Sequence, residues 1–531
     1  MKSRALDTWM TNERGSSLIP DTGIRIPLKI HCAIGHAETS DFKDQLTETR
    51  VSAPPAIGIR SFGAYIPRRR MPRAVIAAAH AWALPNLNAL AKGERSLCSW
   101  DEDVITMAVE AGRDCLRAAA TNEVTALTLA STTAPYADLQ NATLVGAALK
   151  MSADAAMIDT GGSTRAGLSA VIEACQSSRR GNRLVIASDH RQAKPGSVQE
   201  LQYGSGAGAV LIGDGTDLIA AFLGAETVSV PFFDHFRKTN EKFDYYWEER
   251  WIRDEGLGKI VPSAVKALLG KVGRTMAQVA WFGMTGGTAG SDKLVAKLIS
   301  IPAERLVPDL QSEVGDTGAA HGILALIAAL ERAKAGDLVL IVSFAQGCQV
   351  VAFEMLQPVH ASVRRGLRGS ISRRIEESVY MKMLSFSGEV QLDWGMRAET
   401  DNKSALTQLY RSADQIFGFV GGRCESCHAV QFPRLPSCVD CGATDSQKPY
   451  CLADEPAKVA TYTADWLQYS PAPPLYIGLV QFDVGARVLM EMVDVGPEGI
   501  DIGTPLEMIF RIKERDQLRH YDRYFWKATP A

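Results

Sequence analysis

The sequence has little of several features that would each have pointed to a class of protein. Its longest apolar run, Gly322 to Leu330, is far shorter than the roughly 20 residues that a membrane-spanning helix needs. The first residues, MKSRALDTWMTNERGSS, contain no apolar stretch like that of a secretory signal. Positive charge is not in excess, since 57 Lys and Arg face 60 Asp and Glu. We therefore expect a cytoplasmic protein without a membrane or nucleic acid as a partner.

Cysteine is also sparse, and its distribution argues against disulfide bonds. The chain of 531 residues has 10 cysteines, of which four fall between positions 424 and 441 and the others are scattered. Such clustering favours reduced thiols and a metal site. Cys115 and Cys175 lie on apolar helical faces, which predicts burial. At about 150 residues per domain, this length indicates about three structural units.

The clustered cysteines form the most specific motif in the chain. Cys424 and Cys427 make one C-x2-C pair, and after ten residues Cys438 and Cys441 make a second. Each pair can wrap around one ion, and four thiolates in a tetrahedron suit zinc. A closed four-thiolate site leaves no position for water, so we expect a structural metal.

The segment after the cysteines changes to short runs that alternate between apolar and polar residues. Period-two runs separated by Gly and Pro predict a small antiparallel barrel. The runs are Val459–Thr463, Tyr476–Phe482, Val488–Val493 and Leu506–Ile512. A cysteine ribbon followed by about five strands, with a Tyr-Phe-Trp-Lys ending, resembles the DUF35 family, a rubredoxin-like zinc ribbon fused to an OB-fold. That family accompanies thiolase-like proteins, which directs attention upstream.

The upstream part of the chain is an internal repeat. A shift of 155 residues aligns Gly167 with Gly322 and Ser188 with Ser343. In each copy a loop with Gly and Thr opens an Ala-rich helix, and an apolar strand and a glycine-bearing return strand follow. Strands that are apolar at successive positions are covered on both faces, which favours a duplicated five-layer arrangement of sheets and helices.

This duplicated body resembles the thiolase superfamily, and within it the hydroxymethylglutaryl-CoA synthase and ketoacyl-ACP synthase III branches. The order of several stretches carries the resemblance, none of which is unique alone. They are Trp100–Val104, Ile158–Thr160, Ala187–Asp189, Gly204–Ile212 and Lys293–Lys297. The resemblance implies an α/β fold with a thiolase-like five-layer αβαβα body, a homodimer, and a coenzyme A thioester as substrate.

The catalytic cysteine of that superfamily is missing here. The resemblance places it at the start of the first repeat's central helix, where the helix dipole lowers the pKa of a thiol. At this place the chain reads Gly161-Gly162-Ser163-Thr164-Arg165, and Thr164 takes the position of the cysteine. A hydroxyl needs a strong neighbouring base to act as a nucleophile. Thr164 and Ser163 are therefore candidate nucleophiles, with capping of a core helix as the alternative.

The other members of the usual catalytic set are changed as well. The segment before Lys293 contains no histidine, and Asp316 stands where the resemblance expects an asparagine, with His321 following it. Asp316 could accept a proton and His321 relay it; the alternatives are loop capping and core packing. Asp234 beside His235 could tune proton transfer near pH 7, unless the histidine is simply buried and hydrogen-bonded.

Glu102 matches the glutamate that the resemblance implies as general acid–base, although acids also favour the first turn of a helix. Tyrosines offer further acid–base groups. The candidates are Tyr136, Tyr203, Tyr245 and Tyr246.

The loss of cysteine and histidine with retention of acids favours one type of chemistry. Condensation through an acyl-enzyme needs a thiolate, whereas aldol addition or its reversal needs a base, an acid and donors that stabilise a thioester enolate. We therefore favour an enzyme that makes or breaks a carbon–carbon bond next to a thioester by aldol or retro-aldol chemistry. A hydroxymethylglutaryl-CoA synthase-like acyltransferase and a non-catalytic acyl-CoA binding scaffold are the alternatives, and further subunits of a thiolase-like complex could take part.

The predicted organisation follows from these boundaries. We expect an N-terminal extension over residues 1–55 and a linker over 357–414, whose arginine-rich start is either a solvated face or a contact for CoA phosphates. The remaining units are the first thiolase-like half over 56–216, the second over 217–356, the zinc ribbon over 415–448 and the OB-fold over 449–531.

Overall fold

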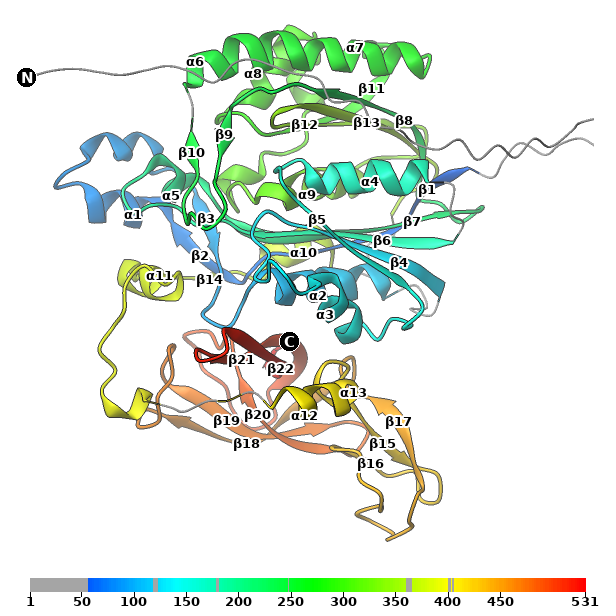
Figure 1. Ribbon diagram of the computed structural model, residues 1–531, viewed down its shortest axis with the longest axis vertical. Coiled ribbons are helices and arrows are strands. Elements are labelled where there is room, and N and C mark those ends of the chain that lie inside the picture. Colours follow the sequence, from blue (N-terminus) through cyan, green and yellow to red (C-terminus); the bar gives the residue numbers. More distant parts are fainter. Residues whose placement is uncertain are drawn as a thin grey trace, which may run out of the picture. The chain divides into compact units, whose positions relative to one another are not determined.

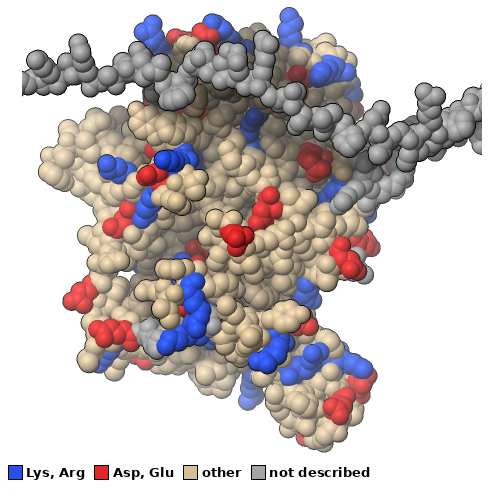
Figure 2. Space-filling model, viewed as in Figure 1, with Lys and Arg blue, Asp and Glu red and all other residues tan. Residues whose placement is uncertain are grey.

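The computed structural model describes residues 56–117, 123–177, 181–246, 248–359, 365–399, 403 and 405–531. The predicted extension over residues 1–55 lies outside these ranges. Within them, no helix combines the length and the apolar character that a membrane crossing requires. On the face drawn in Figure 2, acidic and basic side chains are interspersed, which agrees with the net charge of -3.

The first half of the body contributes five strands, in the order β1-β7-β6-β4-β5, to a continuous nine-stranded sheet. Its parallel strands β4, β5 and β6 are joined by helices, as the repeat predicted. The strands are β1 (Ile57–Tyr65), β4 (Val124–Ala130), β5 (Ala156–Thr160), β6 (Asn182–His190) and β7 (Ser205–Asp214), and the helices are α2 (Val104–Leu116), α3 (Asn141–Ala148) and α4 (Ala166–Gln176).

The second half repeats this plan in the strand order β8-β13-β12-β11. Strand β12 and helix α9 correspond to β6 and α4 of the first half. The strands are β8 (Ala220–Ser229), β11 (Val279–Thr285), β12 (Leu338–Phe344) and β13 (Gly347–Met355), and the helices are α7 (Val261–Lys271), α8 (Ser291–Leu298) and α9 (His321–Leu330). The two halves meet where β1 pairs with β8.

The alternation of side chains along each strand defines the layers. On β6, Leu184 and Ile186 belong to the core on the α2 side, whereas Val185 and Ala187 belong to the core shared with α4 and α9. Strand β12 likewise divides its residues between the central core and the core that contains α7. Figure 1 shows α4 and α9 between the two halves of the sheet, with α2 and α3 outside one half and α7 and α8 outside the other. The predicted five-layer αβαβα body is confirmed.

The C-terminal part contains the predicted ribbon and barrel. Strands β15 (Val420–Cys424), β16 (Val430–Gln431) and β17 (Gln447–Cys451) form the ribbon sheet. Five further strands close into a barrel in the order β18-β19-β20-β22-β21, which fits an OB-like fold. They are β18 (Ala457–Asp465), β19 (Leu475–Phe482), β20 (Arg487–Met492), β21 (Pro505–Asp516) and β22 (Tyr521–Pro530).

Smaller elements flank the body and lead to the ribbon. They are β2 (Arg69–Pro72), α1 (Arg73–His80), β3 (Glu94–Leu97), α5 (Val198–Gln202), β9 (His235–Phe236), β10 (Tyr245–Tyr246), α6 (Glu249–Trp251), α10 (Gly366–Ser372), β14 (Ile375–Glu376), α11 (Tyr380–Phe386), α12 (Leu406–Arg411) and α13 (Ala413–Ile416).

Helix α2 joins the body to the barrel. The backbone N–H of Phe510 donates to the Glu110 carboxylate at 2.9 Å, and the Arg113 guanidinium donates to the Met508 carbonyl at 2.8 Å. Arg113 also lies over the Trp526 ring, 4.8 Å from its centroid. The outer face of α2 is therefore covered by strands of the barrel, and nearly all of its residues are buried.

The arginine-rich start of the predicted linker is ion-paired. Arg365 and Arg373 both bind the Glu507 carboxylate on β21. Arg368 pairs with Glu313. The described arginines of this segment therefore contact acidic groups of the body and barrel. Because the side chains of Arg368 and Arg374 are 44% exposed, the segment is only in part the solvated face that we considered.

Candidate active site

One cavity gathers six of the residues that the sequence singled out. The start of α4, the ends of β11 and β12, the loop before α9 and the hairpin β9–β10 surround it. Its lining residues are Thr164, Arg191, Asp234, His235, Tyr246, Ile252, Thr285, Gly286, Gly287, Asp316, Gly318, His321, Ser343 and Phe344. No cysteine is among them.

Asp234 and His235 form a hydrogen-bonded pair at this cavity. His235 Nδ1 lies 2.8 Å from Asp234 Oδ2, and the Asp234 side chain is 5% exposed. Because an ionised carboxylate only accepts, Nδ1 carries the proton and Nε2 is the basic nitrogen. No described residue hydrogen-bonds Nε2. The His235 ring stacks on Tyr246 at 5.4 Å between centroids, which fixes its plane. The pair is therefore arranged as a general base.

His321 presents a hydrogen-bond donor to the same cavity. The backbone N–H of Thr317 donates to His321 Nδ1 at 3.2 Å, so the neutral ring carries its proton on Nε2. Burial lowers the pKa of His321 more than the nearby Asp316 carboxylate raises it. The imidazole is thus neutral at pH 7 and can donate to an oxygen that gains negative charge.

Asp316 belongs to an ion cluster centred on Arg191. The Arg191 guanidinium donates to Asp316 at 2.5 Å, to Asp244 at 2.7 Å and to the Tyr203 hydroxyl at 2.7 Å. Burial is the largest single effect on the Asp316 carboxyl and favours its neutral form, but Arg191, His321 and the Gly318 N–H together outweigh burial and lower the pKa of this carboxyl. Asp316 accepts from the Gly318 N–H rather than from His321. It is a fixed anion, and its arrangement does not supply the proton relay through His321 that we expected.

The four candidate tyrosines separate into two groups. Tyr246 lines the cavity, and Tyr203 lies behind it on Arg191. Burial raises the pKa of both phenols, which keeps them protonated. Tyr245 is 57% exposed, and Tyr136 stacks on Tyr521 of the barrel.

Glu102 does not line the cavity. Its carboxylate forms an ion pair with Arg511 of the barrel at 2.7 Å and accepts from the Tyr65 hydroxyl at 2.5 Å and the Ser99 N–H at 2.7 Å. Arg511 is fully buried and also binds Asp494 at 2.6 Å. Because these partners occupy both carboxylate oxygens, we leave Glu102 out of the catalytic set and correct our expectation for it.

Ser163 also lies off the cavity lining. Its hydroxyl donates to the Gln346 side-chain oxygen at 2.9 Å, and neither residue is among those that line the cavity. Of the two candidate nucleophiles, only Thr164 lines the cavity.

Sequence reasoning missed Arg191 and Asp244. Arg191 follows Asp189 and His190 at the carboxyl end of β6, and a polar group after an apolar strand is the signal that could have indicated it. Asp244 directly precedes β10, and no local pattern in the sequence indicates that Arg191 is its partner.

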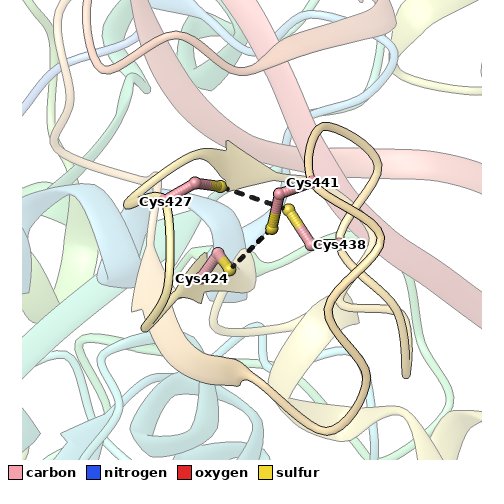
Figure 3. Close-up of side chains that lie close together, drawn as sticks. All are labelled: Cys424, Cys427, Cys438 and Cys441. Atoms are coloured by element: carbon pink, nitrogen blue, oxygen red, sulfur yellow. Dashed lines mark hydrogen bonds between the residues drawn. The ribbon is translucent and has the colours of Figure 1, made fainter.

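The four ribbon cysteines converge on one point. Figure 3 shows their four side chains pointing toward one another. The sulfur atoms of Cys424 and Cys441 are 3.7 Å apart, and those of Cys427 and Cys438 are 3.5 Å apart. All four lie within 4.8 Å of one another. Tetrahedral bonds of about 2.3 Å from zinc to sulfur require separations of this size, so the donor set fits zinc.

Two family models match the chain. Residues 269–354 match the 3-oxoacyl-[acyl-carrier-protein] synthase III C-terminal model. Residues 411–446 match the ChsH2 rubredoxin-like zinc ribbon model, which contains all four cysteines.

Known proteins match over the body. A hydroxymethylglutaryl-CoA synthase of Aeropyrum pernix is 30% identical over 358 residues, which cover 66% of this chain and 96% of the relative. A crystal structure of hydroxymethylglutaryl-CoA synthase complexed with CoA has a TM-score of 0.53 and 16% identity, and covers 66% of this chain and 94% of that chain. A 3-oxoacyl-(acyl carrier protein) synthase III of Pseudomonas aeruginosa has a TM-score of 0.50 and 20% identity, and covers 57% of this chain and all of its own.

These matches leave a substantial part of the chain beyond the body of its relatives, and the ribbon model accounts for part of it. The chain therefore belongs to the hydroxymethylglutaryl-CoA synthase family of the thiolase superfamily, with a zinc ribbon and a small β-barrel joined to its C-terminal side.

Proposed function

We propose that this protein is an acyl-CoA enzyme that makes or breaks the carbon–carbon bond next to the thioester by aldol or retro-aldol chemistry. The observation that carries the proposal is the Asp234–His235 pair, which lies with His321 at a cavity that has no cysteine in its lining. The relatives named hydroxymethylglutaryl-CoA synthase and the CoA complex support a CoA thioester as substrate.

The cleavage direction assigns a role to each group. His235 Nε2 takes the proton of the substrate's β-hydroxyl, the bond between Cα and Cβ breaks, and its electron pair forms the enolate of the thioester. The Cβ fragment leaves as an aldehyde or ketone. His321 Nε2–H donates to the enolate oxygen, and protonated His235 returns the proton to Cα. Addition is the same sequence in reverse.

The test is turnover of a panel of 3-hydroxyacyl-CoA thioesters, followed by the appearance of an aldehyde or ketone. His235→Gln and Asp234→Asn should lower kcat by about 10²–10⁴-fold, because they remove the base or its orientation. His520→Gln and Asp501→Asn, which change exposed residues of the barrel, are the matched controls. Equal activity of His235→Gln and His520→Gln would refute the assigned base.

Condensation through an ester of Thr164 is the second candidate. It is favoured by the position of Thr164 on the same cavity as the Asp234–His235 pair, which could activate its hydroxyl. Intact mass after incubation with acetyl-CoA would reveal an acyl adduct. The adduct should be lost in Thr164→Val, and its absence from the wild type would exclude this candidate.

We further propose that the four ribbon cysteines hold a structural zinc ion. Four thiolates close the coordination sphere, so the ion would stabilise the ribbon and leave no position for a reacting water. Its contribution is to the fold, and every proton transfer above belongs to side chains of the body.

We also propose that the protein is a homodimer. Strand β5 lies at the edge of the sheet, and Ile158 in it is 43% exposed. An exposed edge strand with an apolar side chain is typically paired or covered. Light scattering should give twice the mass of 57.5 kDa for the wild type, and Ile158→Lys should shift it towards the monomer. A monomeric wild type would contradict this proposal.

A further inference from the structure

We infer that Gln346 is a positioning residue that holds the Asp234–His235 pair in its working geometry. This inference rests on the proposed function, because it concerns the same base. Gln346 lies in the turn between β12 and β13 and is not among the residues that line the cavity. It acts through Asp234 and does not touch the reacting atoms.

The hydrogen bonds of Gln346 reach two other segments of the chain. Its side-chain Nε2 donates to Asp234 Oδ1 at 2.8 Å and to the His235 carbonyl at 3.0 Å. Its backbone N–H donates to the same Asp234 oxygen at 3.2 Å. The amide oxygen accepts from the Ser163 hydroxyl at 2.9 Å, next to the start of α4.

In this arrangement the two oxygens of the Asp234 carboxylate bind different partners. Oδ1 is occupied by two donors of Gln346, which leaves Oδ2 directed at His235 Nδ1. The Asp234 carboxylate and the His235 carbonyl only accept, so Nε2 of the amide faces them and its oxygen accepts from the Ser163 hydroxyl. Ser163, which the sequence presented as a nucleophile, therefore orients the residue that orients the base.

The backbone conformation at Gln346 supports a functional role for its side chain. Its φ is +47°, in the left-handed region that glycine adopts more readily than a residue with a Cβ. Glycine would adopt this turn with less strain, so the presence of a glutamine here suggests that its side chain has a function. Removing the side chain should therefore leave the fold intact.

The experiment compares wild type with Gln346→Gly, Gln346→Glu and Ser163→Ala in the full chain. The first readout is the low-field proton resonance of an imidazole Nδ1–H held by a carboxylate, which His235→Gln identifies by its loss. Gln346→Gly and Gln346→Glu should both lose or broaden this resonance, although Glu can still accept from Ser163. Ser163→Ala should weaken it.

The second readout is thioester turnover. In Gln346→Gly, kcat should fall by about 10²-fold, the effect of misplacing a reacting group, while KM stays within about twofold. Its melting temperature should equal or exceed that of the wild type, because glycine suits the turn. A purely structural role would instead lower the melting temperature and spare kcat.

A wild-type resonance and wild-type kcat in Gln346→Gly would overturn the inference. If the wild type turns over no thioester, the proposed function fails, and the resonance still decides whether Gln346 positions the pair.

Discussion

Thr164 stands where the sequence resemblance places a catalytic cysteine. A threonine hydroxyl has a far higher pKa than a thiol, so it would need a neighbouring base to act as a nucleophile. In the proposed mechanism His235 is the base and His321 the neutral donor, roles that their hydrogen bonds to Asp234 and to the Thr317 N–H support. At the scale of single residues the proposal therefore rests on proton transfer.

His190 gives the fold a pH dependence that can be measured. Burial lowers the pKa of His190 to about 4, with a smaller contribution from Arg95, against about 6.5 in the unfolded chain. The unfolded chain therefore binds this proton more tightly, so stability is complete above pH 6.5 and falls as the pH drops towards 4. At pH 5 the loss should be about 2 kcal/mol.

Urea unfolding at pH 7 and pH 5 checks this prediction. His190→Gln should lose less stability between the two pH values than the wild type, because it lacks the titrating group. Identical losses in the two proteins would contradict the role of His190.

The hairpin β9–β10 shows how one element builds the site. His235 and Tyr246 point to the cavity, whereas their neighbours Phe236 and Tyr245 are 48% and 57% exposed, as a period of two requires. Arg237 on this hairpin donates to the Thr132 carbonyl, and Lys242 donates to the Gly388 carbonyl at 3.2 Å. These contacts anchor the element that carries the base.

Strand β21 is joined to the body by the buried pair of Glu102 and Arg511. Glu102→Gln leaves the fully buried guanidinium without one of its charge partners, and we expect a loss of about 3 kcal/mol in the free energy of unfolding. Glu313→Gln breaks the exposed pair with Arg368 and should cost at most about 1 kcal/mol. Thermal unfolding measures the stability loss of each variant. Equal losses would show that the buried pair stabilises the fold no more than the exposed pair does.

The zinc ribbon allows a test of metal binding. Elemental analysis should find one zinc ion per chain in the wild type and none in Cys438→Ser, because three thiolates no longer close the tetrahedron. Cys451→Ser removes a ribbon cysteine outside the cluster and should keep the metal. Loss of zinc in both variants would argue against the assigned ligands.

At the scale of the whole molecule, periodic and spaced residues in the sequence predicted the strands, the layers and the cysteine cluster. The period-two runs predicted the barrel strands, the repeat predicted the five layers, and the spacing of the cysteines predicted their convergence. Cys115 and Cys175 are buried as their helical faces indicated. Each of these predictions needed only the period or the spacing of residues along the chain, and the same periods indicate which residues are buried.

The position of Glu102 could not be predicted in this way. Its partner Arg511 lies on the barrel, and no periodicity near either residue shows that α2 and β21 pack together. The same holds for Arg191 with Asp244 and for Gln346 with Asp234, which are long-range contacts between loops. The resemblance that suggested Glu102 as a catalytic residue covers only the body. It therefore gave no sign that Arg511 of the barrel binds the Glu102 carboxylate.

The most direct test of the central claim is the exchange of the Cα protons of an acyl-CoA thioester in deuterated water, which reports enolate formation without requiring the natural acyl group. The wild type should incorporate deuterium at Cα, and His235→Gln should do so at least about 10²-fold more slowly while His520→Gln matches the wild type. Equal exchange in His235→Gln and the wild type, or no exchange in the wild type, would contradict the account.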